Sequence, residues 1–179
     1  MKKFRAVVLT IATALIASSA FPQHDMPPGM THEQHLALMK KQAQMKQRGN
    51  IAMGFDQDKT THHFYLTSSG GAIQVEANSD ADTASRDQIR THLKKISVEF
   101  ANGDFRAPVA THNEMPPGAE TMQQLKTKIA YSYEERPRGA AVRIASSDET
   151  AINAIHEFLR YQITEHATGD PLTVATNSQ

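Results

Sequence analysis

The sequence predicts an α+β fold, a two-layer sandwich built from a duplicated ββα unit, and an internal repeat is the main reason. Residues 89–104 align without a gap on residues 155–170, and six of the 16 positions are identical, where chance would give about one. A hairpin-like stretch precedes each copy, so each unit reads as strand, turn, strand, helix. Because one unit alone would leave its apolar helix face uncovered, the halves should share one core. We expect a four-stranded, mainly antiparallel sheet with two long helices on one face.

The first unit spans about residues 61–104. The stretches HHFYLT (62–67) and AIQVEA (72–77) flank a Ser-Ser-Gly-Gly turn, a pattern typical of a hairpin. Ser85 and Gln88 form a capping box that should start the following helix. Asn102-Gly103 should end that helix after its apolar face reaches Phe100.

The second unit spans about residues 128–170. Its hairpin is predicted from IAYSYEE (129–135) and AAVRIAS (140–146), and Ser147 is a plausible N-cap for the last helix. Residues 105–118 read as a proline-bearing linker. An extra helix precedes the domain: it starts at a capping box of Thr31 and Gln34 and should stop at Gly49-Asn50.

The N-terminus has the layout of a secretory signal peptide, predicted for residues 1–20. A cationic start precedes an apolar stretch (6–16) and the small residues 17–20, so the mature chain should begin at Phe21. No cysteine follows, which excludes a lipoprotein anchor. The protein is therefore expected in the periplasm or secreted, without a stable membrane anchor. It should comprise a His/Met-containing arm with the extra helix (21–52), the domain (53–171) and a disordered tail (172–179).

Composition excludes several classes of function. Basic and acidic residues balance at 19 each, and no Lys/Arg-rich run is present, which argues against nucleic acid. The chain has no cysteine, so disulfides, thiolate chemistry and Cys-type zinc sites are excluded. The nine histidines all follow the predicted signal, with seven methionines beside them, and this enrichment is the one compositional indication of function.

Histidine and methionine recur together in two similar segments. HDMPPGM (24–30) resembles HNEMPPG (112–118), and both set an imidazole near a thioether on a proline-stiffened loop before a helix. Imidazole suits copper, zinc and nickel, whereas thioether selects Cu(I). The alternative is a rigid turn at the start of a helix, with methionine packing beneath it. If the segments bind metal, copper is the preferred ion, and the candidate ligands are His24, Met26, Met30, His32 and His35 on the arm, with His63, His112 and Met115 on the domain.

Three other histidines are interpreted as packing or helix-end residues. The repeat aligns His92 with Phe158 and His166 with Phe100, and His156 lies beside an apolar helix face. Of the neighbours His62 and His63, only one can face the helices, because successive strand residues point to opposite sides.

Three functions follow as hypotheses. The first is an exported metal-binding protein that buffers or carries copper. The second is a non-catalytic envelope adaptor or scaffold that binds a protein partner through the apolar stripe Leu36, Met39 and Ala43. The third, an enzyme using polar groups around His63 and His112, is the least favoured, because no catalytic motif occurs.

Three segments carry a family resemblance: FDQDKTTHHF, HNEMPPG and IHEFLRYQITEHATGD. Through them, residues 53–171 resemble a group of short exported bacterial proteins without an assigned activity. Some members of that group carry the label aspartate carbamoyltransferase. Such enzymes are cytoplasmic and have a Ser-Thr-Arg-Thr phosphate loop, whereas this chain has Ala84-Ser85-Arg86-Asp87. The resemblance implies the domain limits and export, and no particular reaction.

Overall fold

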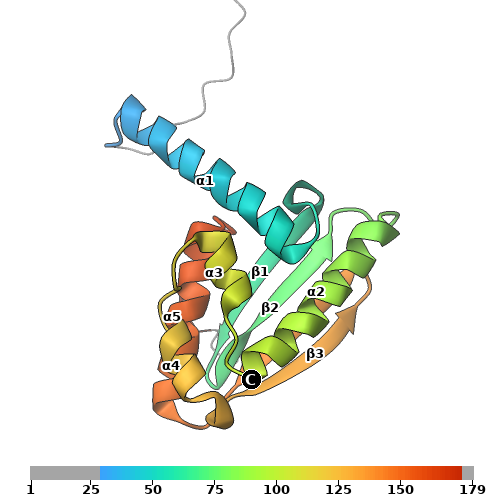
Figure 1. The fold of residues 1–179 in the computed structure, drawn as a ribbon, viewed down its shortest axis with the longest axis vertical. Helices are drawn as coiled ribbons and strands as arrows, with labels where there is room; N and C mark the ends of the chain where they lie inside the picture. The colour runs from blue at the N-terminus through green and yellow to red at the C-terminus, as the bar shows by residue number, and fades with distance from the viewer. Residues whose placement is uncertain (1–28, 175–179) are drawn as a thin grey trace, which may run out of the picture.

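Five α-helices and four strands make up residues 29–174, the part of the chain that the computed structural model describes (Figure 1). In chain order they are α1 (His32–Met53), the 3-10 turn η1 (Gln57–Lys59), β1 (Thr60–Thr67), β2 (Gly70–Ala77), α2 (Thr83–Ala101), α3 (Arg106–His112), α4 (Ala119–Gln124), the 3-10 turn η2 (Lys126–Lys128), β3 (Ala130–Arg136), β4 (Gly139–Ala145) and α5 (Glu149–Glu165). The predicted α+β class is confirmed. The predicted signal peptide and residues 175–179 of the predicted tail lie outside the described residues.

The sheet has the strand order β1-β2-β4-β3, and each neighbouring pair is antiparallel. Its central pairing is symmetric: Ile73 pairs with Val142, and the register places Gly70 opposite Ala145 and Glu76 opposite Gly139. A two-fold rotation through the Ile73–Val142 pair therefore exchanges the two hairpins. Each residue of β3 and β4 therefore has a counterpart in β1 and β2.

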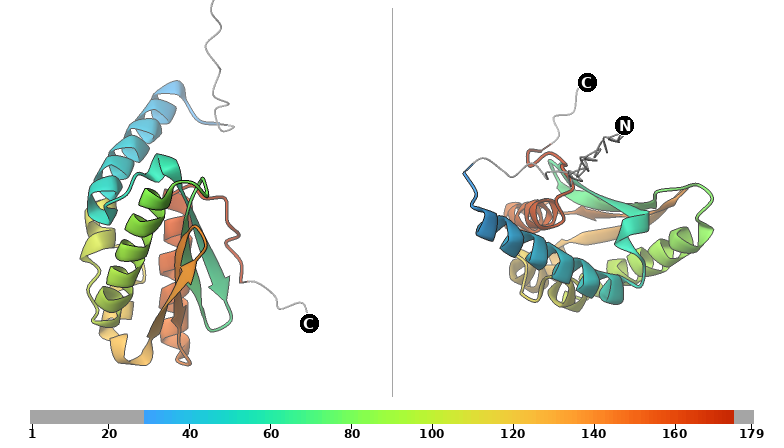
Figure 2. Two further views of the ribbon diagram at one scale, coloured as in Figure 1. Left: turned by 90° about the vertical axis from the view of Figure 1, so that its right-hand side faces the viewer. Right: turned by 90° about the horizontal axis from the view of Figure 1, so that it is seen from above.

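Helices α2 and α5 lie on one side of the sheet, as the right-hand view of Figure 2 shows. Helix α2 follows β2 but lies mainly over β3 and β4, and α5 follows β4 but lies over β1 and β2. Each helix thus covers the hairpin of the other half. Their buried apolar faces, with Ile89, Leu93, Ile155 and Leu159 at their centres, belong to one continuous core, as the sequence predicted.

Glycines at the start of β2 and β4 allow the central strands to approach. A Cβ atom at Gly139 would lie 2.0 Å from the Val75 carbonyl oxygen, and one at Gly70 would lie 2.3 Å from that of Ile144. Contacts this short exclude a side chain at either position.

Helix α1 is longer than predicted and ends at Met53, with Gly54 (φ 78°) as its C-cap. Gly49 does not stop it, because the glycine is buried inside the helix, where a Cβ atom would lie 2.5 Å from the Gln57 amide nitrogen. The second half of α1 packs on α3, and Arg48 Nε donates a hydrogen bond to the Thr111 carbonyl (3.0 Å). The first half projects beyond the domain (Figure 1).

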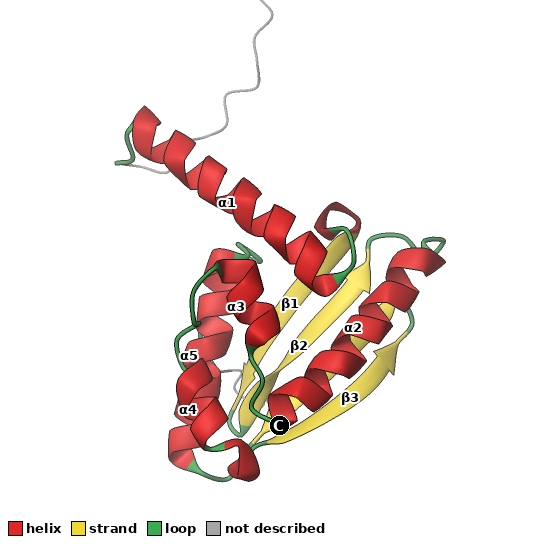
Figure 3. Cartoon of the chain, in the orientation of Figure 1, coloured by secondary structure: helices red, strands yellow, loops and turns green. Residues whose placement is uncertain are grey.

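Three further predictions differ from the structure. The N-cap of α5 is Asp148 rather than Ser147, because the Asp148 carboxylate accepts a hydrogen bond from the backbone N–H of Ala151. Helix α2 begins at Thr83 rather than at Ser85, because the Asp82 carboxylate caps it and accepts hydrogen bonds from the backbone N–H and the hydroxyl of Ser85. The predicted linker contains a helix, α3, with Pro108 in its first turn, where proline leaves no intrahelical hydrogen bond unmade. Figure 3 shows α3 and α4 beside α5.

The segment after α5 caps the edge of the sheet. Asp170 accepts hydrogen bonds from the backbone N–H of Phe64 and from His63 Nδ1 (both 2.9 Å), and from the Thr168 hydroxyl (2.7 Å). Edge strand β1 is thereby covered in part. Within residues 29–174, none of the helices has the length and apolar character needed to cross a membrane.

Candidate functional site: a histidine pocket

Four imidazoles line one cavity between the helices and the sheet. They come from His62 on β1, His92 on α2, His112 at the end of α3 and His166 just after α5. Measured as the space open to the centre of a water molecule, the cavity has a volume of about 60 Å³, enough for a few waters or one small ligand. We call it the histidine pocket; its other walls include Met53, Phe64, Phe100, Thr111, Phe158 and Gln162.

Three of the rings are in contact with one another. His62 stacks on His166 with ring centroids 5.4 Å apart and planes inclined by 17°. His112 meets His166 edge-on, with centroids 5.2 Å apart. Phe55 links the fourth ring to this group, because it packs 5.7 Å from both His62 and His92.

Burial keeps these imidazoles neutral. Desolvation, with smaller contributions from neighbouring charges, lowers the pKa of His62 and His92 to about 4 and that of His166 to about 3. Burial also lowers the pKa of His112, although its hydrogen bond to Gln162 opposes the shift. A neutral imidazole offers one nitrogen lone pair to a ligand.

One hydrogen bond assigns the tautomer of His112. Its Nε2 lies 3.0 Å from Gln162 Oε1, and with the amide in this orientation the oxygen accepts, so Nε2 carries the proton. His112 Nδ1 then has a free lone pair, and it is buried without a hydrogen-bond partner among the described residues. His62 Nε2 and the Gln162 amide nitrogen are also buried without a partner. A buried polar group without a partner costs about 1–3 kcal/mol.

The symmetry of the sheet and the repeat identify the residues that occupy the positions of the pocket histidines in the other half of the domain. His62 is the counterpart of Tyr131, because they pair with the equivalent residues Val75 and Ile144. The aligned helices make His92 the counterpart of Phe158 and His166 that of Phe100. In the other half, Phe100 lies 6.0 Å from both Tyr131 and Phe158. The same three positions thus hold aromatic rings in one half of the domain and imidazoles in the other, although Phe100 and Phe158 also reach the wall of the histidine pocket.

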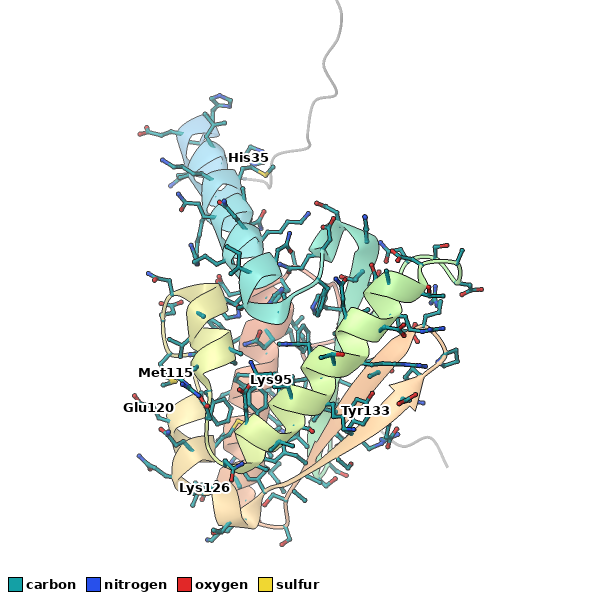
Figure 4. All side chains as sticks on the ribbon, turned by 45° about the vertical axis from the view of Figure 1, so that its right-hand side comes forward. His35, Lys95, Met115, Glu120, Lys126 and Tyr133 are labelled. Carbon is teal, nitrogen blue, oxygen red and sulfur yellow. The ribbon has the colours of Figure 1, made fainter. Side chains whose placement is uncertain are left out.

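The ligands predicted from the sequence occupy separate places. His24 and Met26 lie outside the described residues. His35 lies on the projecting half of α1 (Figure 4), His32 is the first residue of that helix, and Met30 lies just before it. His63 is bonded to Asp170 and Met115 is exposed before α4, so His112 alone of the predicted set lines the pocket. Within the described part of the chain, no three His, Asp or Glu side chains converge as a metal site would require.

Three of the pocket histidines and Met53 were not among the predicted ligands. The alternation of β1 identifies His62 as the inward-facing member of its pair, because Phe64 and Leu66 are buried on the same side. His92 is buried, as predicted. The repeat aligns His92 and His166 with phenylalanines. This alignment was the sequence signal for the site, but it was interpreted as evidence that these histidines are packing or helix-end residues.

Comparison with family models, with curated proteins and with solved structures finds no match for the chain. The geometry alone therefore defines the class of site. It is a small cavity lined by neutral imidazoles, one thioether and apolar rings. Such a lining suits a ligand that accepts nitrogen lone pairs.

Proposed function

We propose that this chain is an exported metal-binding protein, with copper as the preferred ion, and that the histidine pocket is its binding site. The observation that carries the proposal is the hydrogen bond between His112 Nε2 and Gln162, which leaves the buried Nδ1 without a partner. Metal-binding histidines usually donate their other ring N–H to a carbonyl or carboxylate, which orients the ring toward the ion. Gln162 accepts that hydrogen bond here, and the unpartnered Nδ1 is buried.

The spacing of the rings is compatible with a shared ion. With metal–nitrogen bonds near 2.0 Å, two imidazoles on one ion have centroids about 5–6 Å apart. The His62–His166 and His112–His166 centroids are 5.4 and 5.2 Å apart. Since no three His, Asp or Glu side chains of the described residues form a metal-binding group as they stand, binding requires these rings to reorient toward the ion.

The methionine in the wall of the histidine pocket favours copper. Met53 adds a thioether to the lining, and thioether with imidazole selects Cu(I). Cu(I) accepts low coordination numbers, so a pair of imidazoles and one thioether suffice, whereas a structural zinc site is almost always four-coordinate. Neutral imidazoles also bind without having to release a proton first.

A buffer or carrier is the role that fits this chemistry, because the pocket pairs no nucleophile with a base. The predicted arm ligands, His24, Met26, Met30, His32 and His35, would form a second and separate set. They remain a prediction of the sequence and are not needed for the pocket.

Metal titration of the chain from Phe21 onward tests the proposal. Cu(I), Cu(II) and Zn(II) are each added in competition with a chelator of known affinity. We expect His166→Phe and His62→Phe to weaken Cu(I) binding at least about tenfold, which is 1.4 kcal/mol. The matched control His32→Ala/His35→Ala should leave the tightest site unchanged. Binding no tighter than that of surface histidines, or loss of the tight site with the arm histidines alone, would contradict the proposal.

A second candidate is the adaptor. Leu36 and Met39 are 55% and 42% exposed on the projecting half of α1, where they contribute nothing to the core. If this stripe binds an envelope protein, Leu36→Ser/Met39→Ser should abolish crosslinking to that protein without lowering the melting temperature. Unchanged crosslinking would exclude the stripe.

A further inference from the structure

A second hollow adjoins the histidine pocket beneath α1. It has a volume of about 370 Å³, measured in the same way, and is far larger than the pocket. We call it the outer groove; its walls include Gln42, Met45, Thr61, His62, Glu165 and His166.

The two hollows share His62 and His166 as lining residues. Since these two rings stack on each other and line both hollows, the pair lies at the boundary between the outer groove and the histidine pocket. An ion bound by either imidazole from the outer groove would therefore be next to the pocket.

The outer groove also provides donor atoms suited to an incoming cation. Met45 is 6% exposed and contributes a thioether. Glu165 contributes a carboxylate, which Lys41 of α1 pairs with at 2.9 Å. Carboxylate, thioether and imidazole groups thus all line the outer groove, together with the Lys46 ammonium group.

We infer that the outer groove is the entrance through which the metal ion reaches the histidine pocket, with the His62–His166 pair passing it inward. This inference rests on the proposed function. A third hollow, on the α2 side, is the competing entrance, because it shares Met53 and His92 with the pocket. Each hollow is lined by one carboxylate and one ammonium group, from Glu165 and Lys46 in the outer groove and from Asp87 and Lys95 in the third hollow. The outer groove presents two imidazoles, whereas the third hollow presents one, so the outer groove offers an incoming ion more nitrogen ligands.

Two matched tryptophan substitutions, one at each hollow, test the route. Gln42→Trp places an indole on α1 at the outer groove, and Thr91→Trp places one on α2 at the third hollow; neither residue lines the pocket itself. The first readout needs no metal: modification of His62 and His166 by diethyl pyrocarbonate, mapped by peptide mass spectrometry. The second is the rate of Cu(I) binding by stopped flow, with urea unfolding to verify the fold.

We expect Gln42→Trp to slow both the modification and the binding about tenfold, with the equilibrium affinity changed less than about twofold. Thr91→Trp should leave both rates within about twofold of the original chain. Slowing by Thr91→Trp, or unchanged modification in Gln42→Trp, would overturn the route. An original chain that binds no copper would refute the proposed function, and the modification data would still decide whether the groove gives access.

Discussion

His62 stacks against His166 with ring centroids 5.4 Å apart, at the positions where the other half of the domain sets Tyr131 against Phe100. Of these counterparts, Phe100 carries no polar atom, whereas the Tyr131 hydroxyl is, like His62 Nε2, buried without a hydrogen-bond partner among the described residues. The imidazoles differ from the phenyl and phenol rings because their ring nitrogens can act as ligands. This difference between the two halves of the domain is the basis for treating the histidine pocket as a site.

Replacing the imidazoles by phenyl rings should stabilise the metal-free protein. In His62→Phe and His166→Phe, an unsatisfied or weakly satisfied ring is exchanged for an apolar one of similar shape, so we expect a gain of about 1 kcal/mol in the free energy of unfolding. Urea denaturation measures it. The reverse change, Phe100→His, should cost at least about 2 kcal/mol. A loss of stability in both phenyl variants would show that the imidazoles are optimal packing residues.

Acid should destabilise the fold over a defined range of pH. The pKa values of His62 and His92 (about 4) and of His166 (about 3) lie below the ordinary 6.5. Between these values the unfolded chain binds more protons than the folded one, so stability is complete above pH 6.5 and falls as the pH drops toward 4. Each group contributes up to about 1.4 kcal/mol per pH unit there. Urea midpoints at several pH values should show this slope, and His62→Phe/His92→Phe/His166→Phe should flatten it. An unchanged slope in the triple variant would contradict the assignment.

The central strand pairing should depend on Gly139. Gly139→Ala sets a methyl group against the Val75 carbonyl, so we expect a loss of at least about 2 kcal/mol, near the upper range for overpacking. Gly54→Ala is the control: it introduces strain at a positive φ but meets nothing within 4 Å, so about 1–2 kcal/mol is expected. Thermal unfolding compares the two, and equal losses would argue against the close approach of β2 and β4.

The Asp170 carboxylate should protect the edge of β1. Burial opposes its ionisation, but hydrogen bonds from Thr168, His63 and the Phe64 backbone outweigh that effect and lower its pKa. Asp170→Ala should therefore speed hydrogen exchange of the Phe64 amide by at least about tenfold. The amide of Ile73, on the neighbouring strand, serves as the internal control. Equal exchange of Phe64 in both proteins would show that the segment after α5 does not cap the edge.

Local patterns were enough to predict the fold class. The alternation in residues 72–77 and the helical spacing from Ile89 to Phe100 follow directly from burial on one face, and these elements form as predicted. Element boundaries depend on partners distant in the sequence. The sequence predicted that the first helix ends at Gly49, but the Gln57 side chain packs against this glycine and α1 continues to Met53.

The pocket could not be predicted from local patterns, because its residues come from β1, β2, α2, α3 and α5, from the end of α1 and from His166 just after α5. Which of His62 and His63 faces inward follows from alternation. That His62 meets His166 depends on α5 crossing to the other hairpin, which no local pattern encodes. The predicted association of His112 with Met115 rested on proximity in the chain, whereas the fold points His112 at Gln162.

Nitrogen-15 NMR of the histidine side chains during addition of one equivalent of Cu(I) tests the central claim most directly. If the pocket is the binding site, the ring signals of His62, His112 and His166 should shift or broaden first, while those of His32, His35, His63 and His156 stay in place. Shifts confined to the arm histidines, or no shift in any ring, would contradict a metal site in the histidine pocket.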